Sequence, residues 1–101
     1  MPRKLPEFVE SITPLVRTLE DVGQRVRNQR AGSRLRIDDA AALCGVSSDL
    51  FSRLENGKPV TLDKLLKVLD GLGLRLLLVP TAQMPELETA LNSSGTNTPE
   101  S

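Results

Sequence analysis

The sequence predicts an all-α fold of four to five short helices, followed by one C-terminal β-strand. Between residues 15 and 69, apolar residues recur mostly at spacings of three and four, the period of a helix with one buried face. Threonine or serine precedes several of these runs, as helix N-caps do. A later stretch, residues 74–79, has five apolar positions in six and ends at Pro80, which indicates a strand.

The first helix is predicted to begin at Thr13 and to end near Arg30. The Thr13 hydroxyl can cap an unpaired N–H group, and Pro14 at the first helical position needs no donor. Four apolar residues then follow at spacings of four, three and four, which places them on one helix face. These residues are Leu15, Leu19, Val22 and Val26.

Two shorter helices are predicted next, joined by a glycine turn. The first spans Ile37 to Cys44, with acidic residues in its first turn, where the helix dipole favours them. Gly45 ends it. Ser47 then caps a helix from Ser48 to Asn56, which is followed by a glycine that tolerates left-handed geometry.

A fourth helix is predicted to begin after its cap, Thr61, and to end at residues 71–73, where two glycines occur. The strand over residues 74–79 has no partner strand in the chain, so it exposes unpaired backbone groups. The predicted core is aliphatic because the chain has only two aromatic residues. Its predicted members are Val22, Val26, Ala41, Leu43, Phe51, Leu54, Leu62, Leu65, Leu66 and Leu69.

The chain of 101 residues is expected to form one small domain with polar ends. Residues 1–12 are predicted to be an N-terminal arm, residues 13–79 the helical domain with its strand, and residues 80–101 a disordered tail. Within that tail, at most a weak helical turn is expected near residues 86–91.

Composition excludes most enzyme classes. The chain has no histidine and a single cysteine, so the usual general base, a Cys/His metal cluster and an intramolecular disulfide are all missing. We therefore expect no catalytic activity, no cofactor and no metal. No segment approaches eighteen apolar residues and no hydrophobic signal core follows the N-terminus, so we expect a cytoplasmic protein without a membrane partner.

The formal net charge of zero conceals a strong polarity along the chain. Residues 1–36 carry eight basic and four acidic groups, whereas the remainder carries an acidic excess. A neutral protein of this kind can still present one basic edge to an anionic partner.

The two short central helices have the features of a helix-turn-helix. Ala40 and Ala41 allow the second helix to cross closely, and Gly45 permits the tight turn. Residues 35–56, together with the motif Phe-Ser-Arg-Leu-Glu-Asn-Gly-Lys-Pro over residues 51–59, resemble the phage-repressor-type (Cro/repressor, or XRE) family of DNA-binding proteins.

The residues that follow this motif indicate a particular branch of the family. The sequence Leu-Asp-Lys-Leu-Leu-Lys-Val-Leu-Asp-Gly-Leu-Gly-Leu-Arg-Leu-Leu-Leu resembles the HipB-like antitoxin branch, in which a strand after the helical domain pairs across a dimer. The resemblance covers about residues 14–79. It implies a homodimer joined through Leu74, Leu76 and Leu78 that binds a palindromic operator in double-stranded DNA.

The resemblance also implies which residues contact DNA. The start and exposed face of the third helix would enter the major groove. Two departures from the family pattern occur at Arg36 and Ile37, where a serine or threonine cap and a glutamine are usual. Asp49 is open to two interpretations, contact with a cytosine amino group or interaction with the helix dipole, and we favour the second. The implied major-groove residues are Ser47, Ser48, Asp49, Ser52 and Arg53.

A run of five arginines lies at the end of the first predicted helix and in the loop into the second, with no acidic residue between them. In the fold that the resemblance implies, this segment approaches the DNA backbone, so we favour phosphate contacts over a merely solvated surface. The arginines are Arg25, Arg27, Arg30, Arg34 and Arg36, of which the last four are predicted phosphate ligands.

Three functional hypotheses follow. The leading one is a dimeric repressor that serves as the antitoxin of a HipA-like kinase and regulates its own operon. The second is a repressor of the same fold with no toxin. The third is a helical protein-interaction module that has lost DNA binding, which the acidic residues after position 37 favour.

Overall fold

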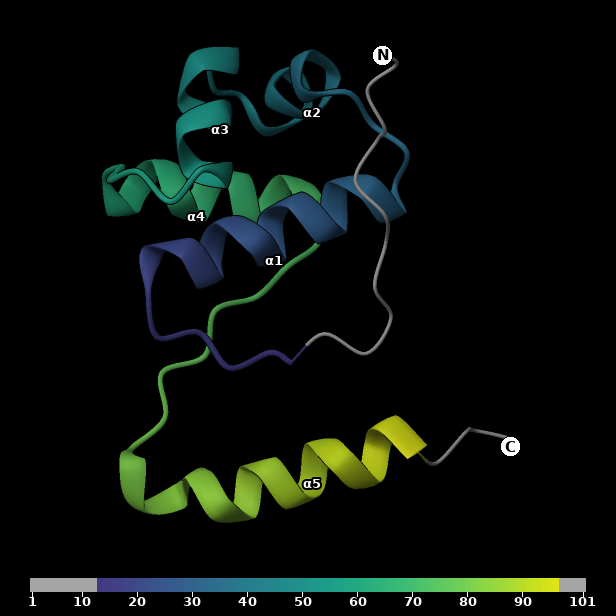
Figure 1. The fold of residues 1–101 in the computed structure, drawn as a ribbon, viewed down its shortest axis with the longest axis vertical. Coiled ribbons are helices and arrows are strands. Elements are labelled where there is room, and N and C mark those ends of the chain that lie inside the picture. Colours follow the sequence, from purple (N-terminus) through teal and green to yellow (C-terminus); the bar gives the residue numbers. More distant parts are fainter. Residues whose placement is uncertain (1–12, 97–101) are drawn as a thin grey trace, which may run out of the picture.

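Four helices pack into one body in the computed structural model, and a fifth lies apart from it (Figure 1). The structure describes residues 13–96, so the predicted N-terminal arm, residues 1–12, and the last five residues lie outside the described part. The helices α2 and α3 lie at one end of the long axis, and α5 lies at the other (Figure 1). The elements are α1 (Leu19–Gly32), α2 (Ile37–Cys44), α3 (Ser48–Glu55), α4 (Leu62–Leu72), the 3-10 turn η1 (Thr81–Gln83) and α5 (Met84–Thr96).

The N-cap of the first helix is Thr18, five residues after the predicted cap, Thr13, so that α1 begins at Leu19. Thr18 Oγ1 accepts a hydrogen bond from Asp21 N at 3.0 Å, and Asp21 Oδ2 accepts one from Thr18 N at 3.2 Å. This reciprocal capping box satisfies two backbone donors at once. Thr13 has no such partner three residues on, and its hydroxyl instead accepts from Leu15 N at 3.2 Å. The Thr13 start was therefore a wrong prediction.

Replacing Thr18 with alanine is expected to lower the free energy of unfolding by about 1 kcal/mol, because the Asp21 amide is then left without its partner. The matched change at Thr13 is expected to have almost no effect. Urea unfolding of the two variants measures the difference, and equal losses would contradict the assignment of Thr18 as the cap.

The capping box also has a defined pH dependence. The Arg17 amide, which donates to the Asp21 carboxylate at 3.0 Å, lowers the pKa of Asp21 below its usual value, and the Thr18 amide and hydroxyl add to this. A carboxyl group whose pKa is lowered by folding stabilises the protein above its unfolded pKa. The contribution of Asp21 is therefore present at neutral pH and is lost as the pH falls through the lowered pKa.

Two close helix contacts determine how the body packs. A Cβ atom on Gly23 of α1 would lie 2.6 Å from the carbonyl oxygens of Leu54 and Glu55, so only glycine lets α1 approach the end of α3. A Cβ atom on Gly71 of α4 would lie 2.9 Å from the Cα atom of Cys44 at the end of α2. These contacts place α3 against α1 and place α2 against α4.

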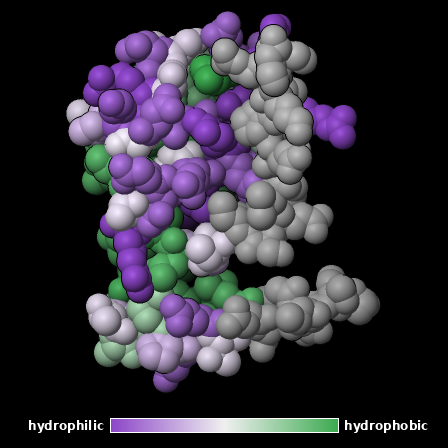
Figure 2. Space-filling model, in the orientation of Figure 1, coloured by the Kyte–Doolittle hydropathy of each residue, from purple (hydrophilic) through white to green (hydrophobic). Residues whose placement is uncertain are grey.

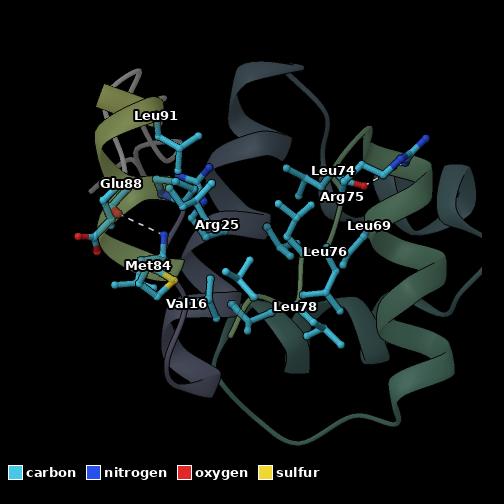
Figure 3. A pocket seen from close by; sticks show the side chains of 18 of the residues that line it. Val16, Arg25, Leu69, Leu74, Arg75, Leu76, Leu78, Met84, Glu88 and Leu91 are labelled. Atoms are coloured by element: carbon cyan, nitrogen blue, oxygen red, sulfur yellow. Dashed lines mark hydrogen bonds between the residues drawn. The ribbon is translucent and has the colours of Figure 1, made fainter. Parts of the chain in front are cut away.

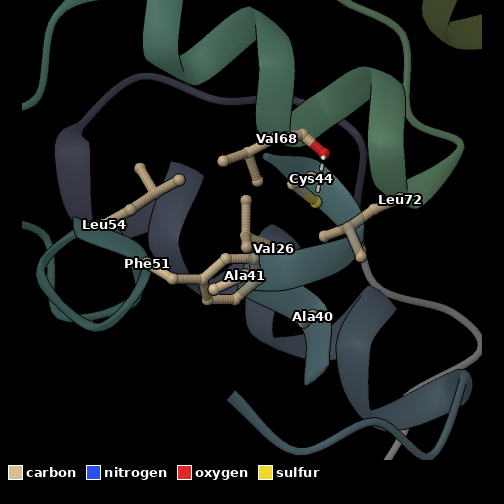
Figure 4. Close-up of a cluster of buried hydrophobic side chains, with 8 residues drawn as sticks. All are labelled: Val26, Ala40, Ala41, Cys44, Phe51, Leu54, Val68 and Leu72. Atoms are coloured by element: carbon tan, nitrogen blue, oxygen red, sulfur yellow. Dashed lines mark hydrogen bonds between the residues drawn. The ribbon is translucent and has the colours of Figure 1, made fainter. Parts of the chain in front are cut away.

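The predicted glycine turn between α2 and α3 is confirmed. Gly45 has φ +76°, the left-handed conformation that favours glycine. Ala40 and Ala41 are buried, as expected of small residues at a close helix crossing. Their side chains lie in the core with Phe51, which is fully buried in its centre (Figure 4).

Several leucines predicted to lie in the core are exposed. Leu43, Leu62 and Leu66 are 60%, 62% and 45% exposed. The inward face of α4 is rotated from the predicted one, because Val68 and Leu72 enter the core instead (Figure 4). The spacing of the apolar residues correctly predicted a helix. It did not show which face is buried, because α4 carries leucine on two adjacent faces.

The C-terminal part differs from the predicted disordered tail. The strand predicted over residues 74–79 does not form within the described chain: residues 74–80 have no regular secondary structure and run as an extended segment from α4 to η1 and α5 (Figure 1). Met84, Leu87 and Leu91 recur at spacings of three and four, so α5 has one apolar face that the composition of the tail obscures. The described chain therefore contains a fifth helix where only a turn was predicted.

Candidate nucleic-acid interface

The third helix presents a polar face at one end of the molecule. Ser47 is its N-cap, and its hydroxyl oxygen accepts a hydrogen bond from Leu50 N at 3.1 Å. Phe51 and Leu54 are buried and anchor the opposite face in the core. Of the predicted reading residues, Ser48, Asp49 and Arg53 are exposed and Ser52 is half-buried.

Several of these residues have defined partners within the protein. Ser48 Oγ donates to Asp38 Oδ1 of α2 at 2.8 Å. Arg53 Nη2 donates to the carbonyl oxygen of Pro59 at 3.0 Å, and Asn56 Nδ2 donates to the carbonyl oxygen of Ser52 at 2.8 Å. A guanidinium group has five N–H donors, so Arg53 keeps donors for a guanine edge.

A buried ion pair holds the end of α3 in place. The Arg30 guanidinium donates from Nε and Nη2 to the two carboxylate oxygens of Glu55, the second bond at 2.8 Å. Arg30 and Glu55 are 6% and 5% exposed. Arg30 Nη1 also donates to the carbonyl oxygen of Leu35 at 2.9 Å. One arginine of α1 is thus bonded to α3 and to the loop that enters α2.

The predicted phosphate contact of Arg30 is wrong for this reason. Its side chain is buried and its donors face Glu55 and Leu35, so it does not reach the surface. The sequence contained a signal for this, since Arg30 follows Val22 and Val26 at steps of four and therefore continues the buried face of α1. Glu55, its partner, belongs to the family motif, and sequence reasoning assigned it no role.

Arg27 lies next to the same ion pair but remains partly exposed. Its Nε atom lies 3.5 Å from Glu55 Oε1, and its Nη2 atom donates to Asn56 Oδ1 at 3.4 Å. The side chain is 42% exposed. Both contacts are long, so Arg27 is attached to the end of α3 without being enclosed by it.

The remaining arginines of the run point in different directions. Arg34 and Arg36 are exposed in the loop between α1 and α2. Arg36 is the N-cap residue of α2 and makes no side-chain cap bond, and Arg34 has φ +58°. Arg25 lies elsewhere, along a cleft beside α5 (Figure 3), and burial lowers its pKa. The run is therefore not one continuous basic surface.

The cleft beside α5 contains the predicted dimerisation residues. It has a volume of about 590 Å³ and is lined by residues 13–16, by α1, α4 and α5, and by the extended segment 74–79. Apolar side chains gather at this place on the surface between the body and α5 (Figure 2), and Leu76 and Leu78 extend from the segment beside Val16 and Leu69 (Figure 3). Leu74 is half-buried, whereas Leu76 and Leu78 are 47% and 88% exposed.

Other chemistry is limited in the part of the chain that the structure describes. Cys44 is buried, its thiol donates to the carbonyl oxygen of Val68, and burial raises its pKa, so the thiol is uncharged at neutral pH. Residues 13–96 contain no group of three acidic or cysteine side chains that could hold a metal ion. None of the described helices is long and apolar enough to cross a membrane.

Comparison with known proteins assigns this arrangement to a family. A family model described as a helix-turn-helix domain matches residues 21–81. The match covers most of α1, all of α2, α3 and α4, and the extended segment, whereas α5 lies beyond it. No curated protein matches the chain.

Proposed function

The chain belongs to the helix-turn-helix domain family, and from this premise we propose that it is a transcriptional regulator that places α3 in the major groove of DNA. The observation that supports this most is the position of α3, which is anchored by Phe51 and Leu54 while its polar face is exposed at one end of the molecule. Ser48 and Arg53 are the residues of this face that we propose contact base edges, whereas Asp49 lies in the first turn of α3, where it interacts favourably with the helix dipole.

Arg34 and Arg36 are the proposed phosphate ligands. Both are exposed, and both lie in the loop that enters α2, the helix that crosses the DNA backbone in this motif. Arg27 is a weaker candidate because it lies beside Glu55. Ser47 can add a phosphate contact, since its oxygen accepts from Leu50 N and its own hydroxyl hydrogen remains available.

Replacing Arg34 and Arg36 together by alanine is expected to weaken binding to random and specific duplexes alike, because phosphate contacts carry no sequence information. The slope of log affinity against log salt is expected to flatten by about 0.9 for each phosphate ligand removed. Fluorescence anisotropy with a labelled duplex at several salt concentrations measures this slope.

Arg17 provides the control. It is exposed, it lies outside the extended segment, and its neighbours, residues 13–16, line the cleft beside α5 rather than the end that carries α3. Its replacement by alanine removes one arginine and is expected to leave the salt slope unchanged. A salt slope that changes as much in Arg17→Ala as in the paired variant would contradict the assignment of Arg34 and Arg36.

We propose that the regulator is a homodimer joined through the extended segment. Within residues 13–96, no backbone–backbone hydrogen bond involves residues 75–79, and three consecutive leucines of this segment are exposed. Antiparallel pairing with a second copy about a two-fold axis would satisfy both the backbone and the apolar surface. The dimer would then present two α3 helices, one from each protomer, to the two half-sites of a palindrome.

The antitoxin role is a finer proposal, and the sequence resemblance over residues 62–78 supports it. We propose a HipA-like kinase as the partner, docked away from α3 so that the complex still binds DNA. Co-purification of the two co-expressed proteins tests this. A kinase encoded beside this chain that fails to co-purify at low salt would leave a repressor with no toxin.

One observation favours a function without DNA. Asp38, Asp39 and Asp49 are all exposed in the first turns of α2 and α3, where they would repel phosphates. A helical interaction module that binds a basic partner would use the same surface. The salt-slope experiment separates the two functions, because this module would not bind duplex DNA.

A further inference from the structure

We infer that Asp38 determines which bases Ser48 can select. The Ser48 hydroxyl donates to Asp38, so it presents only acceptor lone pairs to the major groove and selects a base that carries an amino group, adenine or cytosine. This inference rests on the proposed function, since it concerns the same face of α3.

The contact joins the two helices of the motif. Ser48 is the first residue of α3, and Asp38 lies in the first turn of α2. The Ser48 Oγ to Asp38 Oδ1 distance is 2.8 Å, a normal length for a hydroxyl that donates to a carboxylate. An ionised carboxylate has no hydrogen to donate, so the direction of this bond is fixed.

The bases that Ser48 can contact follow from the hydrogen-bond donors and acceptors that each base presents in the major groove. A serine hydroxyl without a partner can donate or accept, and so it can contact either kind of base. When its hydrogen is directed to Asp38, Ser48 can accept from adenine N6 or cytosine N4. The O6 and N7 atoms of guanine and the O4 atom of thymine are acceptors, and they face its oxygen with no hydrogen between them.

The hydroxyl group of the neighbouring Ser47 has the opposite hydrogen-bonding role, that of a donor to DNA. The Ser47 oxygen already accepts from Leu50 N, which leaves its hydroxyl hydrogen for a phosphate oxygen. Ser48 cannot make that contact while it donates to Asp38, because phosphate oxygens are acceptors. Two adjacent serines are thus assigned different ligands, the DNA backbone for Ser47 and a base amino group for Ser48.

The test compares three single variants by selection of binding sites from a random duplex library. Ser48→Ala removes the acceptor. Asp38→Asn keeps the shape, but its amide can donate to Ser48 and release the hydroxyl hydrogen. Asp39→Asn is the matched control, because it removes the same charge from the same helix turn and Asp39 is not the partner of Ser48.

The wild-type chain is expected to prefer adenine or cytosine at one position of each half-site. Ser48→Ala and Asp38→Asn are expected to lose about 2- to 10-fold of that preference at the same position, the range for one hydrogen bond. Asp39→Asn is expected to keep the preference. Both asparagine variants are expected to bind all duplexes more tightly, because each loses one negative charge.

Two outcomes would overturn the inference alone. In the first, Asp38→Asn retains the wild-type preference while Ser48→Ala loses it. In the second, the preference that depends on Ser48 is for guanine or thymine. Failure of the folded wild-type chain to bind any duplex would instead overturn the proposed function, and the inference with it.

Discussion

Replacement of Glu55 by alanine is expected to lower the free energy of unfolding by about 3–5 kcal/mol, the range for breaking a buried ion pair by removing one partner. Arg30 would remain buried with its charge uncompensated and two of its donors without acceptors. Small domains have about 5–15 kcal/mol of stability in total, so this loss is a large share of it.

The loss is expected to be specific to the buried partner. Arg27→Ala removes an arginine from the same carboxylate, but its side chain is 42% exposed and its contact is 3.5 Å long, so the cost is expected to be about 1 kcal/mol or less. Urea unfolding measures the free energy of unfolding of both variants, fitted with the same dependence on urea concentration.

A volume-matched apolar pair provides a second control. Changing Arg30 to methionine and Glu55 to leucine together is expected to recover most of the stability, because neither charge then has to be buried. A loss below about 1 kcal/mol for Glu55→Ala would contradict the role of this pair in holding α3.

Replacement of Leu78 by lysine is expected to convert the proposed dimer into monomers and to weaken operator binding by about 100-fold or more, because the two half-sites are then no longer bound as one unit. Leu78 is 88% exposed in the single chain, so the lysine costs the monomer little. In the paired segment, the two-fold axis would bring two such lysines to the interface.

Sedimentation and operator binding measure this effect together. Leu43 on α2 is also largely exposed, at 60%, and lies outside the extended segment, so Leu43→Lys is expected to leave the dimer intact. An intact dimer in Leu78→Lys and in a chain truncated after Gly73 would show that the extended segment is not the interface.

The sequence predicted the central part of the fold well, because its signals there are local. Gly45 adopts the left-handed conformation that ends a helix, and Ser47 is an effective N-cap, so α2 ends and α3 begins at the predicted residues. The start of α1 was misplaced because two threonines compete for the cap, and only Thr18 has an aspartate three residues later.

The prediction of the site was less reliable, because a charged residue there can be buried and paired within the protein instead of facing DNA. Arg30 belongs to a basic run in sequence, but helix geometry turns it inward to Glu55, a residue twenty-five positions away. The direction of the Ser48 hydroxyl depends on Asp38, ten positions away in another helix. Such long-range pairings cannot be read from composition or local spacing.

The central claim is that α3 of a dimer reads a specific duplex, and selection with the unmodified chain from a random duplex library tests it most directly. The predicted result is enrichment of a palindrome whose half-site centres lie about 34–36 Å apart, one helical turn of DNA. A folded chain that enriches no sequence at low salt would contradict the assignment of α3 as a DNA-reading helix.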